Sequence, residues 1–176
     1  PDDQLSFSRF GSHTVHDLPR LQVCTEAYQR RVRTLARHTD TDLGAPDVEA
    51  ALQAALAIPD EDEEAVSGAA ILLVTASPLW TIEAPLRALR ASQHTLHVLT
   101  VGLEAGQSLW QELAEASGGA CEVLAPGQHV ETHLARLFDH IVQIDAGATA
   151  REMTNANARS RVRPAGPVPS CWERPI

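Results

Sequence analysis

Ser77 is the residue best placed for nucleophilic chemistry, because it follows the apolar run of residues 69–74. Hydrolases that carry a serine after a buried strand hold it in a Gly-x-Ser-x-Gly turn. Here the segment is T-A-S-P-L (residues 75–79), which lacks both glycines, and Pro78 disfavours a helical conformation at Ser77. No Gly-x-x-x-x-Gly-Lys phosphate loop occurs. We expect no enzymatic activity; the alternative, a small hydrolase, requires a reactive Ser77 or cysteine.

His129 and His133 are four residues apart, a spacing that can place two zinc ligands on one face of a helix. Together with His140 they stand beside an expected buried stripe that includes Val130 and Leu134. We therefore interpret the three histidines as a row that flanks the buried stripe on its solvent side.

The other histidines and cysteines do not form ligand pairs. His94 and His97 are an odd number of residues apart in an expected strand, which directs them to opposite faces. Cys24, Cys121 and Cys171 are odd in number and far apart, which argues against a disulfide framework and against zinc. This usage favours a reducing compartment, and we expect a cytoplasmic protein.

Composition disfavours two kinds of partner. The formal net charge is −9 and 4% of the residues are aromatic, whereas nucleic-acid binding needs a concentrated positive surface and often aromatic stacking platforms. The acidic run at residues 60–64 is typical of a solvated loop. No run approaches the roughly 18 apolar residues of a membrane-spanning helix. We expect neither nucleic acid nor a membrane as partner.

The elements that would position these residues alternate along the chain. Residues 4–10 and 13–18 predict a hairpin that ends at Pro19, and two amphipathic helices follow, one from Thr25 and one from Pro46. The run 69–74 is continuously apolar, as expected of a strand buried on both faces of a parallel sheet. Strands at 95–101 and 121–124 then alternate with three helices. This order predicts an α/β fold with a mostly parallel, doubly wound sheet and helices on both faces.

Past Asp145 the composition changes. Residues 151–163 contain four arginines, and four prolines follow. We expect a domain over residues 1–144 and a basic, proline-rich tail over 145–176. The tail would lie across an acidic face of its own domain or of a partner, with Trp172 as an anchor, or be disordered.

Five short strings in this order resemble the von Willebrand factor A domain, and most closely bacterial members similar to the inter-alpha-trypsin inhibitor heavy chains. They cover roughly residues 1–144 and are Leu5-Ser-Phe-Ser-Arg-Phe-Gly, Thr41-Asp-Leu-Gly, Ile71-Leu-Leu-Val-Thr, Thr100-Val-Gly and Leu113-Ala-Glu-Ala-Ser-Gly-Gly-Ala-Cys. The resemblance implies a doubly wound sheet with a metal-ion-dependent adhesion site where loops converge at the carboxyl ends of the strands.

Three loops build that site in the family: an Asp-x-Ser-x-Ser motif, a threonine and an aspartate. The threonine corresponds to Thr41, or alternatively to Thr39, whereas the position of the aspartate is taken by Ala76 and the serine motif is absent. Asp42 could substitute as a ligand, although aspartate in such a turn more often caps the next helix. A small hard cation needs carboxylate ligands, so the resemblance implies a degenerate site, with Thr41 and Asp42 as vestigial ligands and no cofactor. Mg²⁺ is the alternative.

The family's first strand lies between the strands that correspond here to residues 4–10 and 69–75, and it has no counterpart in this sequence. Without it the sheet would expose two unpaired edges. We expect the strand to come from upstream sequence of the same polypeptide, or else from a partner protein.

These features predict a non-enzymatic protein–protein interaction module with a degenerate metal site, a scaffold or subunit of a larger assembly. The alternative is a ligand-binding domain that depends on a divalent cation and whose metal site is completed by an upstream segment. Ser77, Leu79, Trp80 and Trp172 are the candidate partner contacts, because aromatic anchors contribute strongly to interfaces. The competing interpretation is that Trp80 packs over the next helix as a lid on the core.

Overall fold

The computed structural model describes residues 3–39, 43–60, 62, 66, 68–102 and 107–143. The description below concerns the compact unit Pro1–Ile141. Thr41, Asp42 and the expected tail with Trp172 lie outside the described residues. No helix within the described ranges is long and apolar enough to cross a lipid bilayer.

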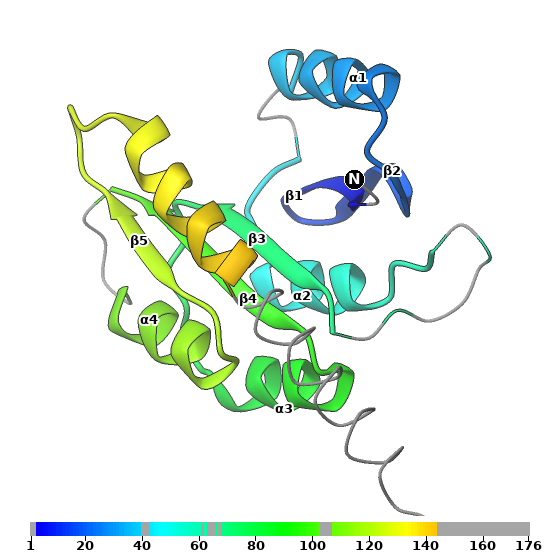
Figure 1. The fold of residues 1–176 in the computed structure, drawn as a ribbon. Coiled ribbons are helices and arrows are strands. Elements are labelled where there is room, and N and C mark those ends of the chain that lie inside the picture. The colour runs from blue at the N-terminus through cyan, green and yellow to red at the C-terminus, as the bar shows by residue number, and fades with distance from the viewer. Residues whose placement is uncertain are drawn as a thin grey trace, which may run out of the picture. The chain divides into compact units, whose positions relative to one another are not determined.

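The first two strands form an antiparallel hairpin, as the sequence predicts (Figure 1). β1 spans Gln4–Phe10 and β2 spans Thr14–Val23. The predicted end of β2 at Pro19 is wrong. The register shift between Leu5 and Phe7 leaves residues 19–21 opposite a single residue of β1, so Pro19 is accommodated in a bulge where no ladder hydrogen bond is required of it.

Helix α1 (Glu26–Arg37) begins at Thr25, whose side chain accepts a hydrogen bond from the backbone N–H of Tyr28. The hydroxyl of Tyr28 donates to the carbonyl oxygen of Leu5 at 2.6 Å, which attaches α1 to β1. This contact uses the one fully buried side chain of the helix, and the arginines of α1 lie on its exposed side.

Helix α2 (Val48–Leu56) is capped by Asp47, whose carboxylate accepts a hydrogen bond from Ala50 N–H at 3.0 Å. The backbone N–H of Asp47 donates to the carbonyl oxygen of Gly11, so the hairpin turn touches the start of α2. Gly11 is required by close approach, because a Cβ at this position would overlap the carbonyl oxygen of Leu43.

The second half of the unit is a parallel sheet in the order β3-β4-β5, which confirms the predicted α/β class. β3 spans Ala70–Thr75, β4 spans Thr95–Val101 and β5 spans Cys121–Leu124. The crossover helices are α3 (Glu83–Ser92) and α4 (Gln107–Ala116), and a last helix covers residues 130–143.

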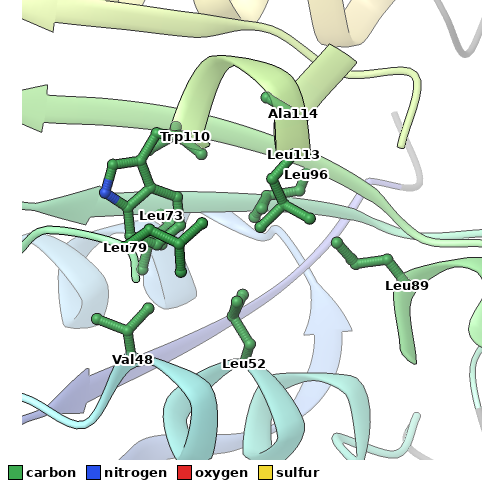
Figure 2. Packing of buried hydrophobic residues seen from close by; sticks show 10 residues of the cluster. Val48, Leu52, Leu73, Leu79, Leu89, Leu96, Trp110, Leu113 and Ala114 are labelled. Carbon is green, nitrogen blue, oxygen red and sulfur yellow. The ribbon is translucent and has the colours of Figure 1, made fainter. Parts of the chain in front are cut away.

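The main core lies between this sheet and helices α2, α3 and α4 (Figure 2). In this core, α2 places Val48 and Leu52 toward Leu73 of β3 and Leu96 of β4. The side chain of Leu79, from the loop after β3, lies between α2 and the sheet. The other members of the cluster are Leu89, Val98, Trp110, Leu113 and Ala114. Burying these large side chains stabilises the unit because each removes its apolar surface from water.

The last helix covers the opposite face of the sheet, where it buries Leu137 and brings His140 edge-on to His97 of β4, with ring centroids 5.5 Å apart. The predicted solvent-flanking row of histidines is therefore wrong for two of its members. His133 is buried and His140 is half-buried, whereas His129 is exposed. The face of the helix that is buried against the sheet is centred on Leu137, and it includes His133 and part of His140.

β3 is less buried than its apolar sequence predicts. Val74 is 51% exposed, whereas every interior residue of β4 is buried. The reason is position: in the described part of the chain β3 pairs only with β4, and β1 pairs only with β2, so β3 is an edge strand. The hairpin and the parallel sheet are thus two separate sheets.

Candidate interaction site

Parallel strands end at the same edge of a sheet, so the segments after β3 and β4 lie together. We call residues 76–82 and Gly102 the loop edge. The backbone N–H of Ser77 donates to Thr75 Oγ1 at 3.0 Å. The indole Nε1–H of Trp110 in α4 donates to the carbonyl oxygen of Ser77 at 2.9 Å, so a buried aromatic residue holds the loop in place.

Ser77 lines a cavity of about 10 Å³ beside Trp110, which is room for about one water molecule. The other lining residues are Ala76, Thr100, Val101, Gly102 and Gln107, and the Gln107 amide donates to Gly102 O at 2.8 Å. None of these described residues is an acid, a histidine or a cysteine, so the cavity presents no general base to Ser77.

The described residues of the loop edge include no carboxylate, the ligand that a small hard cation requires. Ala76 is exposed directly after β3, and its methyl group offers no ligand atom. The hydroxyl of Thr75 accepts from Ser77 N–H, and that of Thr100 donates to Glu122 O at 3.4 Å. Thr39, the alternative metal threonine, instead donates to Leu35 O at the end of α1.

No group of three or more histidine, cysteine or acidic residues that could hold a metal occurs among the described residues. Of the acidic run 60–64, Asp60 and Asp62 are described, and Asp60 Oδ1 accepts from the backbone N–H of Asp62 at 3.0 Å. This local hydrogen bond is typical of an Asx turn.

The two apolar residues at the tip of the loop edge have opposite environments. Leu79 is only 5% exposed and belongs to the main core, so its expected role as an accessible contact residue needs correction. Trp80, the next residue, is 80% exposed and therefore does not form a lid over the core. The sequence could not separate them, because both are large apolar residues in the same loop.

Trp80 borders a hollow of about 360 Å³, which we call the Trp80 hollow. It is lined by residues 46–49 at the start of α2, residues 78–81 after β3 and Pro85 of α3. Three of these residues are prolines and two, Asp47 and Glu49, are acidic. No local pattern predicts this hollow, because α2 and the loop edge are about thirty residues apart along the chain.

The chemistry of Cys121 also differs from that of a catalytic thiol. Burial in the sheet raises its pKa to about 11, with smaller contributions from the negative charges of Glu122 and Glu115. Because the thiolate is the nucleophile, this residue is unreactive near neutral pH. Cys24, the other described cysteine, is also unpaired.

A polar cluster joins β5 to the last helix. Glu122 Oε2 lies 2.8 Å from His133 Nδ1 and 3.4 Å from Arg136 Nη1. His133 is mostly buried in this cluster, whereas Arg136 is largely exposed and adds little to the pairing. The sequence contains one indication of this pairing: Glu122 is an acidic residue inside the short, otherwise apolar strand β5, where its carboxylate needs a partner. The cluster anchors the last helix to β5.

A parallel sheet with helices on both faces, and loops that meet at the carboxyl ends of its strands, defines the class as a doubly wound α/β protein. Among solved structures, the chain is similar to a von Willebrand factor type A protein from Catenulispora acidiphila, with a TM-score of 0.57 and 14% identity over 70% of this chain. It spans only 30% of that protein.

Two further structures are similar over 81% of both chains. One is an aerotolerance-related membrane protein from Bacteroides fragilis NCTC 9343, with a TM-score of 0.61 and 15% identity. The other is the conserved hypothetical protein BatB from Bacteroides thetaiotaomicron, with a TM-score of 0.56 and 16% identity. No family model and no curated protein matches the sequence. The chain therefore has a von Willebrand factor A-like fold, which confirms the resemblance at the level of the fold.

Proposed function

We propose that this chain is a non-enzymatic protein–protein interaction module whose metal-ion-dependent adhesion site is degenerate, and that it serves as a scaffold or subunit of a larger assembly. The main support for the proposal is the exposure of Trp80. This large aromatic side chain is 80% exposed, and it stands on a loop that the hydrogen bond from Trp110 holds in place. Exposed aromatic residues on fixed loops are typical anchors of protein interfaces.

The contact is tested by placing a photo-crosslinking amino acid at position 80 in the full-length protein. We expect crosslinks to a discrete protein partner from this position. The matched control is position 138, where Phe138 is also an exposed aromatic residue but lies on the last helix. Equal crosslinking from both positions, or none from position 80, would contradict the proposal.

The metal-free part of the proposal is supported by the donors at the loop edge, where the described side chains near Ala76 offer hydroxyls and no carboxylate. Isothermal calorimetry of the intact protein with Mg²⁺ and Mn²⁺ should detect no binding. Sub-millimolar binding of either ion would overturn this part and favour the alternative, a divalent-cation-dependent ligand-binding domain.

That alternative makes its own prediction, because Thr41 would complete a metal shell supplied mainly by an upstream segment. In the full-length protein, Thr41→Val would then abolish capture of the partner, and a chelator would do the same. Capture that is unchanged by both treatments removes the alternative.

The proposal includes a source for the strand that the family places between β1 and β3. Within the described ranges, β1 pairs only with β2 and β3 pairs only with β4. The edges that this leaves open and the exposure of Val74 support the addition of a strand, because unpaired backbone and apolar surface favour it. We assign the strand to the same polypeptide, with a partner protein as the alternative. Amide hydrogen exchange in β3 should be slower in the full-length protein than in this chain alone. Equal exchange in both would remove this part of the proposal.

The composition of the chain bears on its partner and its location. A net charge of −9 supports a protein partner over nucleic acid, since phosphate binding needs a positive surface. The distant cysteines support a cytoplasmic location, and the lack of an apolar run of roughly 18 residues in this sequence supports the absence of a membrane partner. Fractionation of cells that express the full-length protein would test both.

A further inference from the structure

The Trp80 hollow has an apolar floor and walls built from rigid side chains. Its floor is formed by residues that are buried in the unit, among them Val48, Leu79 and Pro85. The indole ring of Trp80 and the proline rings of Pro46 and Pro78 also line the hollow. Rings of this kind lose little conformational entropy when a ligand packs against them, so the hollow is largely preformed for binding.

The rim of the hollow is negatively charged. Asp47 and Glu49 are both exposed at the start of α2, and both line the hollow. The carboxylate of Asp47 stays oriented because its Oδ1 accepts the hydrogen bond from Ala50 N–H. The described lining residues include no basic side chain, and the whole chain carries a net charge of −9. The hollow therefore favours a ligand with positive charge.

We infer that the Trp80 hollow binds an extended, proline-containing segment of a partner protein that also carries arginine. This inference rests on the proposed function and names the chemistry of its partner. Polyproline II segments are already extended and ordered before binding, and they dock into grooves lined by aromatic side chains. A guanidinium group pairs with carboxylates and stacks on an indole ring, and Asp47, Glu49 and Trp80 offer both interactions in the lining of the same hollow.

The experiment is a fluorescence anisotropy titration of the full chain against a labelled peptide of sequence Arg-Pro-Ala-Pro-Pro-Ala-Pro-Arg. We expect saturable binding that weakens at least tenfold in Trp80→Ala and several-fold in Glu49→Gln, with the Glu49 contribution lost at high salt. Phe138→Ala, which removes an exposed aromatic residue elsewhere, should bind like the original chain. Circular dichroism verifies that each variant is folded.

Two control peptides separate the parts of the inference. Replacing both arginines by glutamate should abolish binding, and replacing the prolines by alanine should weaken it by the cost of ordering the peptide. Equal affinity for all three peptides would overturn the inference, as would binding that Trp80→Ala leaves unchanged. Binding that is detected only after residues 151–176 are deleted would overturn the assignment to a partner, because that segment of the chain also contains arginine and proline.

Crosslinking at position 80 and peptide binding together distinguish failure of the polyproline assignment from failure of the proposed function. If position 80 crosslinks to a protein partner in the full-length protein but the peptide does not bind, the interaction module stands and the polyproline assignment is wrong. If neither crosslinking nor peptide binding occurs, both are wrong.

Discussion

Replacing Leu79 and Trp80 by alanine, one at a time, should separate the two roles of the loop edge, because these neighbours differ in exposure from 5% to 80%. Leu79→Ala removes buried methyl groups that pack between α2 and the sheet (Figure 2). Core Leu→Ala changes cost about 2–5 kcal/mol, and a loop can partly collapse into the space, so we expect about 2–3 kcal/mol here. Trp80→Ala removes surface that is already in water and should change stability by less than about 0.5 kcal/mol.

Urea unfolding followed by circular dichroism measures both free energies, and the slope with urea shows whether the variants unfold as the original chain does. For a chain of this size, the cost at Leu79 corresponds to a melting temperature lower by about 4–12 °C. A loss below about 0.5 kcal/mol in Leu79→Ala would refute its place in the core. A loss above about 1 kcal/mol in Trp80→Ala would mean that the indole packs on the unit as a lid.

Two further predictions concern the parallel sheet. Gly119→Ala should destabilise the unit by about 1–3 kcal/mol in the same urea assay, because the new Cβ would overlap the carbonyl oxygen of Leu96 in β4. The comparison variant is Gly127→Asn, where no atom lies within 4 Å of the added Cβ. It should cost less, because it adds only the strain of the left-handed backbone conformation, which asparagine tolerates better than most residues. In a variant that keeps Cys121 as its only cysteine, the rate of alkylation should rise with pH to a midpoint at about 11, since burial disfavours the thiolate. The folded state keeps the thiol proton that the unfolded chain releases above its ordinary pKa of 9.0. The free energy of unfolding should therefore fall as the pH rises from 9.0 to about 11. An alkylation midpoint near 9 would contradict the burial argument.

Local patterns in the sequence were enough to predict most of the elements. The continuous apolar run before Thr75 and the strand at 95–101 required a parallel sheet, and the helices between them follow from spacing alone. Pro19 misled the prediction of β2, because Pro19 lies in a bulge of the ladder, where the hydrogen bond that proline cannot make is not required. Such compensation depends on the partner strand and leaves no mark near the proline.

At the candidate site, the sequence by itself determined the chemistry that is missing: Ala76 offers no carboxylate, and Ser77 has no glycine elbow. Only the tertiary structure decided which apolar side chain is available for contact, because burial depends on what packs against a residue and not on its type. It placed Leu79 against α2, left Trp80 in solvent and brought the acidic start of α2 beside it. It also turned the last helix so that His133 meets Glu122, a pairing set by the packing of Leu137 that no local pattern could predict.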